Sequence, residues 1–417
     1  MRKLSLSALT AAGLLAGGLA TGANAADLGG NCCADLEERV SELEATTARK
    51  GNRKVSLTVS GWVAEQITYW DDSVEHNVYV GGIGTTLGTN VKFSGQATIA
   101  PGWTAGYLIH LEADGSDTLA GTSQSTPDGQ GLFTSKANFV QTLQSYWFLK
   151  SDQLGKVSVG LQSMVSDNLA ILVDGSGSLV PANWVTFDVG GFSYRTKGGS
   201  IAGTPLIITG SGNCNGGGDC YGIPVNSVRY DSPTFAGFSF SAAWGEDDVW
   251  DVGGRYAGEF AGFKLAAAVG YGEVSKFATN PGLGHFQMDS QYTQAGVYVQ
   301  HVASGLFALV NYGNLDWTNS NNNETWYVKG GIRQRWTSLG HTVLYGEWDT
   351  STSSNHGVDF AGQDFFGGGI VQEIDNAAMS LWVSYRNFSP DNSAFGRTGL
   401  NELEDFQYVK AGALINF

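Results

Sequence analysis

Residues 324–336 read Glu-Thr-Trp-Tyr-Val-Lys-Gly-Gly-Ile-Arg-Gln-Arg-Trp, and large apolar side chains alternate with bases along this stretch. Successive residues of a β-strand point to opposite sides. One face then carries Trp326, Val328, Ile332 and Trp336, and the other face carries Lys329, Arg333 and Arg335. A cation held against lipid costs about 2–4 kcal/mol at the middle of a bilayer. The stretch is therefore predicted to span a membrane, with its basic face toward water.

The same alternation recurs from Val55 to Phe417, in segments separated in turn by tight turns and by long polar loops. Sixteen antiparallel strands are predicted, an even number as in bacterial barrels, at residues 55–70, 89–100, 103–112, 139–150, 156–162, 226–231, 235–245, 250–260, 263–273, 290–301, 305–316, 324–336, 341–349, 365–374, 379–388 and 405–417. The sequence thus predicts an all-β transmembrane barrel over residues 55–417. A barrel of this size leaves an aqueous lumen.

Composition agrees with a membrane barrel. Glycine is abundant (59 residues), aromatic residues reach 12%, and charged residues only 15%. A mean hydropathy of −0.10 fits this class, because only alternate residues of each strand face lipid. The net charge of −16 argues against nucleic acid as a partner.

The N-terminal residues have the features of an export signal. Met1-Arg2-Lys3 is followed by a short apolar run and by Ala23-Asn24-Ala25, which predicts a signal peptide over residues 1–25. Residues 26–54 are predicted to form a periplasmic helical segment. Leu36, Val40, Leu43 and Thr47 follow a heptad spacing in it. This helix either packs on the barrel or forms a trimeric coiled coil, and the residues leave both readings open.

The strand rhythm breaks at residues 163–225, which are rich in Gly, Ser and Asp. A loop of that length needs a functional reason or is disordered. We expect part of it to fold into the lumen and narrow the channel; a disordered surface loop is the alternative. The expected constriction carboxylates are Asp167, Asp174 and Asp188.

Further bases are expected on the inner face of the barrel. Together with Lys329, Arg333 and Arg335 they form a predicted basic wall that also includes Arg229, Arg255, Arg386 and Lys410. Such a wall, facing the loop carboxylates, would set a transverse field that favours polar solutes. The six histidines are scattered singly, so neither a metal site nor a cofactor is predicted, and the chain is not expected to be an enzyme.

The four cysteines lie in two close pairs. Cys214 and Cys220 are predicted to form a disulfide, because the spacer of residues 215–219 is flexible and an exported protein permits oxidation. The adjacent pair Cys32 and Cys33 would need a strained ring, and its role stays open.

Two stretches resemble Gram-negative trimeric porins, especially those of alphaproteobacteria. They are residues 226–238, which read Asn-Ser-Val-Arg-Tyr-Asp-Ser-Pro-Thr-Phe-Ala-Gly-Phe, and the terminal strand from Tyr408 to Phe417. The resemblance implies a sixteen-stranded homotrimer in the outer membrane, a third loop folded into the lumen, and a terminal Phe417 read by the barrel-assembly machinery. The heptad segment is similar to the periplasmic coiled coil of some dicarboxylate-channel porins.

The sequence and the resemblance together predict an outer-membrane porin for passive diffusion of small hydrophilic solutes and ions. Two alternatives stay open. One is a substrate-biased channel that binds anionic metabolites such as dicarboxylates on lumen arginines, or sugars on lumen aromatics such as Trp62 and Trp382. The other is a barrel that serves as an envelope tether or a receptor.

Overall fold

The computed structural model describes residues 54–84, 88–114, 123–125, 139–185, 189, 191–206, 224–274, 290–318, 321–396 and 402–417. The predictions for the signal peptide, the helical segment except its last residue, Lys54, and all four cysteines lie outside the described residues, as does the one for Asp188. Every strand of the predicted barrel lies at least in part within them.

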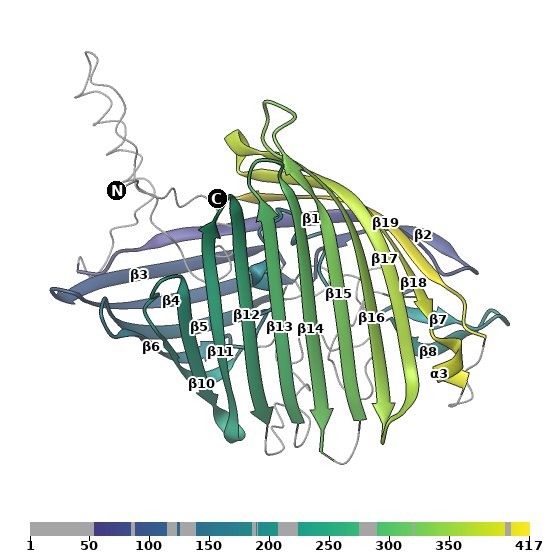
Figure 1. Ribbon diagram of the computed structural model, residues 1–417, viewed down its shortest axis with the longest axis horizontal. Helices are drawn as coiled ribbons and strands as arrows, with labels where there is room; N and C mark the ends of the chain where they lie inside the picture. Colours follow the sequence, from purple (N-terminus) through teal and green to yellow (C-terminus); the bar gives the residue numbers. More distant parts are fainter. Residues whose placement is uncertain are drawn as a thin grey trace.

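The barrel wall is built from antiparallel strands that follow one another around it (Figure 1). They are β1 (Thr58–Asp71), β2 (His76–Gly82), β3 (Asn90–Ala100), β4 (Trp103–Asp114), β5 (Phe139–Ser151), β6 (Gly155–Gln162), β9 (Val225–Asp231), β10 (Phe238–Gly245), β11 (Val249–Phe260), β12 (Phe263–Val274), β13 (Ser290–His301), β14 (Leu306–Trp317), β15 (Asn321–Gln334), β16 (Thr342–Asn355), β17 (Val358–Ile374), β18 (Met379–Pro390) and β19 (Phe406–Asn416).

The barrel closes where the first strand pairs with the last. Residues Trp62–Asp71 of β1 face Gln407–Asn416 of β19 in antiparallel register. On its other side β1 pairs with β2 through its second half and with β3 through its first half. β2 and β3 therefore occupy one strand position, and the wall has the sixteen positions that the sequence predicted.

The strand at residues 76–82 was not predicted, because it carries the polar pair His76-Asn77 and ends at Gly81-Gly82. A second difference concerns residues 350–364, which were predicted to be a loop. β16 and β17 continue through most of them and meet at His356-Gly357, both with positive φ. The Thr- and Ser-rich sequence of this region lacks the alternation that marks the lipid-facing part of a strand.

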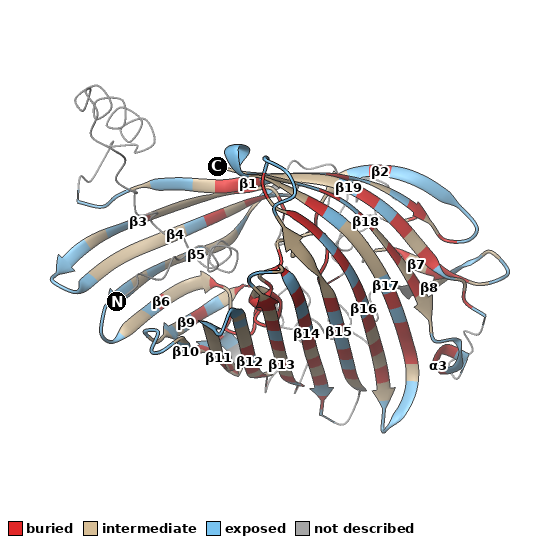
Figure 2. Ribbon diagram, turned by 45° about the horizontal axis from the view of Figure 1, so that its top comes forward, coloured by how far each residue is buried: buried red, intermediate tan, exposed pale blue. Residues whose placement is uncertain are grey.

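Side-chain exposure alternates along the strands (Figure 2). On β14, for example, Leu306 and Val310 are exposed on the outside while Phe307 and Leu309 are buried on the inside. An apolar outer face is what a lipid environment requires. Among the described residues, no helix has the length and apolar character needed to cross a membrane.

The barrel also contains a chain segment that is not part of its wall. We call residues 163–224, between β6 and β9, the third loop. Its described part contains the short helix η1 (Ile171–Val173) and the hairpin of β7 (Ser193–Arg195) and β8 (Ile201–Pro205), which lies near α3 (Asn392–Gly396) in Figure 1. Apolar loop residues such as Leu169, Trp184 and Phe192 share a buried cluster with inner-face wall residues. The loop is thus packed inside the barrel, as the sequence predicted.

Candidate functional site: the third loop and the channel wall

The third loop begins at two wall arginines. Arg229 of β9 donates hydrogen bonds to the carbonyl oxygens of Ser163 (3.0 Å) and Met164 (3.2 Å). Arg255 of β11 donates to the carbonyl oxygen of Val165 at 3.3 Å. Three consecutive carbonyls are therefore held by two cations, and both arginines fix the direction in which the loop leaves the wall.

The inner face of the wall carries glycines where it contacts the start of the third loop, and these allow the loop to approach closely. A Cβ atom on Gly253 would lie 2.8 Å from Val165, and one on Gly270 would lie 2.4 Å from Leu169. On Gly296 a Cβ atom would lie 2.5 Å from the carbonyl oxygen of Ala170, a backbone atom that cannot rotate away. Part of the high glycine content thus serves the packing of the loop.

The middle of the loop is tied to β15. Lys329 places its Nζ 2.5 Å from Oδ2 of Asp174 and 2.7 Å from the carbonyl oxygen of Ala182. Both side chains of the ion pair have no exposed surface. These two residues were predicted to lie on opposite sides of a constriction, and the structure brings them into direct contact.

A second buried cluster lies beside the first. Arg386 of β18 donates to both carboxylate oxygens of Glu347 at 2.8 Å and to the carbonyl oxygen of Asn183 at 2.6 Å. Tyr327 donates to Glu347 as well, at 2.6 Å. Sequence reasoning missed Glu347, although its position between the outward Gly346 and Trp348 marks it as an inner-face residue.

The remaining predicted bases lie apart from these clusters. Arg333 of β15 pairs with Glu373 at 2.7 Å. Arg335 was predicted within a strand, but β15 ends at Gln334; Arg335 lies in the following turn and pairs with Asp375. Lys410 is buried, with its Nζ 5.0 Å from the ring centroid of Tyr408.

Asp167 lies buried at the start of the loop, where it accepts a hydrogen bond from Asn168. Burial raises the pKa of this carboxyl to about 7, against the opposing effects of Ser163, Arg229 and Asn168. A group with such a pKa changes charge near neutral pH. Its protonation state therefore sets the charge of the loop at this point.

The far end of the third loop reaches the wall on the opposite side. Phe192 packs against Trp70 (5.3 Å between ring centroids) and Phe406 (5.1 Å). Tyr194 donates a hydrogen bond to Gln363 at 2.7 Å. The loop is thus fixed at its start, middle and far end, and its described part extends from the wall at β9 to that at β1 and β19.

Four inner-face cations form no ion pair with a described residue. They belong to the wall from β3 to β12 and are Lys92, Lys150, Arg255 and Lys264. Lys92 instead lies over the ring of Trp62, with 4.6 Å between Nζ and the ring centroid. Among the described residues, no group of three or more His, Cys, Asp or Glu side chains is arranged to bind a metal ion.

A closed antiparallel barrel with an apolar outside and a folded loop within defines an outer-membrane channel. The chain belongs to the Gram-negative porin family, whose sequence profile matches residues 8–401. Its place is therefore the outer membrane, and family and fold indicate a channel rather than an enzyme.

Solved structures with the same fold share little sequence with the chain. An anion-selective porin from Comamonas acidovorans is 15% identical, with a TM-score of 0.55 over 87% of this chain and 100% of that one. The outer-membrane channel DcaP of Acinetobacter baumannii is 11% identical, with a TM-score of 0.53 over 88% and 99%. The trimer form of OmpT from Vibrio cholerae is 13% identical, with a TM-score of 0.52 over 87% and 99%. No curated protein sequence matches the chain.

Proposed function

We propose that the chain is a porin for passive diffusion of small hydrophilic solutes and ions, with the third loop as its constriction and no covalent chemistry. The observation that carries this proposal is the loop itself, which is fixed inside a sixteen-strand barrel by buried contacts to Lys329 and Arg386. A loop held in this way narrows a water-filled lumen without closing it. Among the predicted bases, Arg229, Arg255 and Arg333 are only partly buried and are proposed to line the channel, with Asp167 beside the first two at the start of the loop.

Single-channel recording in a planar lipid bilayer tests the proposal. The purified protein is expected to give large ohmic conductance steps, and a trimer gives them in groups of three. Swelling of liposomes in sugar solutions should show entry of small sugars and exclusion of larger ones. An assembled barrel that conducts neither ions nor sugars would instead favour the role of an envelope tether or receptor.

A preference for anions is the second candidate function. It is favoured by the four inner-face cations without ion pairs, since fixed positive charge raises the local concentration of anions. The anion-selective porin named above is compatible with it. The reversal potential under a potassium chloride gradient tests this preference. A sign expected for a chloride-selective channel supports it, and a sign expected for a potassium-selective channel excludes it.

We further propose that the protein is a homotrimer, with small solutes and outer-membrane lipid as its other partners. Glu65 supports this, because it lies on the outer face of β1 between the exposed Val63 and Ile67. A carboxylate on the lipid face is unfavourable, and contact with a second subunit removes it from lipid. The trimer form of OmpT is compatible with the same assembly. Native mass spectrometry in mild detergent should give three times the mass of the chain.

The segments outside the described residues complete the proposal. Residues 1–25 are removed on export, residues 26–54 lie in the periplasm, and Cys214 and Cys220 form a disulfide. The N-terminal sequence of the mature protein should begin at Ala26. Mass spectrometry of the unreduced protein should show a peptide with Cys214 linked to Cys220; free thiols at both positions would exclude the disulfide.

A further inference from the structure

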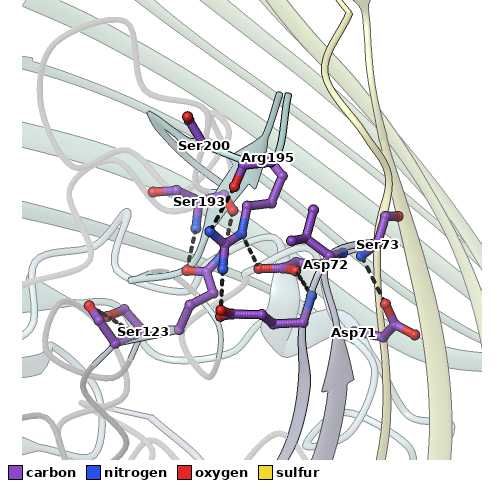
Figure 3. Close-up of polar contacts among 12 residues, drawn as sticks. Asp71, Asp72, Ser73, Ser123, Ser193, Arg195 and Ser200 are labelled. Atoms are coloured by element: carbon purple, nitrogen blue, oxygen red, sulfur yellow. Dashed lines mark hydrogen bonds and ion pairs between the residues drawn. The ribbon is translucent and has the colours of Figure 1, made fainter. Parts of the chain in front are cut away.

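The hairpin of β7 and β8 is attached to the barrel rim by one charged side chain, Arg195 (Figure 3). Its Nε donates to Oδ2 of Asp72 at 2.7 Å, its Nη2 to Oε2 of Glu75 at 2.6 Å, and its Nη1 to the carbonyl oxygen of Gly199 at 3.1 Å. Arg195 and Asp72 are almost fully buried, whereas Glu75 is 60% exposed. The far end of the third loop is thus joined to the turn between β1 and β2.

The turn that receives Arg195 is itself well ordered by hydrogen bonds. Oδ1 of Asp72 accepts the backbone N–H groups of Val74 (3.1 Å) and Glu75 (2.7 Å), which leaves Oδ2 directed at the guanidinium. One carboxylate therefore fixes both the turn and the loop. The guanidinium donates to two separate carboxylates, one hydrogen bond to each, and this forked geometry favours arginine over lysine.

The other contacts of the hairpin are neutral. Gln124 and Ser193 exchange two hydrogen bonds, and the backbone near Arg195 pairs with that of Glu402 and Glu404. Neutral hydrogen bonds of this kind can be replaced by water when the hairpin leaves the rim. Loss of the guanidinium would instead leave the buried carboxylate of Asp72 without its cation. Arg195 is therefore the charged contact that resists release of the hairpin, in addition to the buried packing of Phe192 and Tyr194.

The wall next to this end of the loop is polar. Tyr194 bonds to Gln363, and Gln363 lies opposite Ser351 in a polar region of β15, β16 and β17. Tyr194 thus meets the wall at polar side chains, and this contact is one of the anchors of the far end.

From these observations we propose that Arg195 is a positioning residue that sets the size limit of the channel. It holds the far end of the third loop at the turn between β1 and β2. The inference rests on the proposed function, because only a diffusion channel has a size limit. When the anchor is lost, the far end leaves the rim and the lumen admits larger solutes.

Liposome swelling with neutral sugars of increasing size tests the proposal, together with recordings of single channels. Arg195→Met keeps the length of the side chain but removes its charge. It is expected to raise the rate for large sugars relative to small ones several-fold and to add conductance levels. Arg195→Lys keeps the charge but not the fork of donors, and should restore only part of the size limit. Arg335→Met, which breaks an ion pair in the turn after β15, is the matched control. It should leave the ratio of the swelling rates for large and small sugars unchanged.

An Arg195→Met protein that assembles and keeps the wild-type ratio would overturn the proposal. If that variant does not assemble, Glu75→Gln decides, since it removes only the exposed partner of the anchor. A rise in the swelling rate for large sugars relative to small ones, smaller than that expected for Arg195→Met, supports the proposal. An unchanged ratio in Glu75→Gln overturns it. A wild-type protein that admits no sugar would refute the proposed function itself, whereas a wild-type size limit that Arg195→Met leaves intact refutes the role of Arg195 alone.

Discussion

Lys329 on β15 and Asp174 in the third loop, 155 positions apart in the sequence, form an ion pair with no exposed surface on either side chain. The lysine also donates to the carbonyl oxygen of Ala182, so one ammonium group holds two points of the loop. Burial removes both charges from water, and their favourable interaction depends on the presence of both partners. The pair therefore fixes the middle of the third loop to β15.

Removing one partner of this ion pair should destabilise the barrel. Lys329→Met leaves the Asp174 carboxylate buried alone, and we expect a loss of about 3–5 kcal/mol in the stability of the native barrel. The double variant Lys329→Met, Asp174→Asn should recover part of that loss, because no charge remains unpaired. The temperature at which the assembled barrel denatures, followed by its mobility on gels, measures both effects. Equal losses in the single and double variants would contradict a direct pairing.

The glycine at position 296 should be required for the loop to approach the wall. Gly296→Ala places a Cβ atom 2.5 Å from the backbone oxygen of Ala170, so the loop must shift. We expect a destabilisation of about 1–3 kcal/mol and a changed single-channel conductance. Gly254→Ala is the matched control, because nothing lies within 4 Å of its Cβ position. A conductance that stays at the wild-type value in Gly296→Ala would show that the loop does not pack there.

The unpaired cations of the wall should set the preference for anions. Lys150 and Lys264 lie on inner faces and form no ion pair with a described residue, so their removal leaves no buried carboxylate behind. The double variant Lys150→Gln, Lys264→Gln is expected to move the reversal potential toward that of potassium. Arg335→Gln controls for the loss of a base in a turn outside the lumen. The proposed preference fails if the double variant and the wild type have the same reversal potential.

Asp167 should make the channel sensitive to pH near neutrality. Its pKa of about 7 means that it gains a negative charge as the pH rises from 6 to 8. Anion preference should therefore weaken with rising pH, and Asp167→Asn should abolish this change. Because the folded-state pKa is raised, the folded state binds the proton more tightly, and Asp167 destabilises the fold increasingly as pH rises from about 4 to 7. Reversal potentials at several pH values, with and without the substitution, measure the first effect.

The strands facing lipid were predictable because lipid imposes a period of two on every one of them. Lys329 and Arg386 were identified as inner-face residues by that rule alone, since each lies between residues of the outer face. The continuation of β16 beyond Asp349 was not predictable in this way. Thr350 and Ser351 lie beyond the lipid-facing part, where both faces are polar and no alternation remains.

The partners of the predicted charges were harder to infer than the charges themselves. Lys329 contacts Asp174, and Arg386 contacts Glu347, over separations of 155 and 39 positions. Register within a strand says which face a residue lies on, but the path of a long loop through the lumen has no periodic signal. The anchor at Arg195 shows the same limit, because its carboxylate partners lie in a turn 120 or more positions away.

Phe417 should matter for closure and assembly of the barrel. Phe417 and Gly61 exchange two backbone hydrogen bonds of 3.1 Å at the seam between β19 and β1, and the ring of Phe417 lies over Gly61. Deletion of Phe417 removes both bonds and the aromatic end that the porin resemblance assigns to recognition by the assembly machinery. We expect a marked loss of folded protein in the outer membrane, measured by fractionation and heat-modifiable mobility. Phe260→Ala, which removes another exposed aromatic ring next to a tight turn, should assemble normally. Phe417→Ala separates the two contributions, because it keeps the backbone bonds: a defect as large as that of the deletion assigns the effect to the ring, and normal assembly assigns it to the seam.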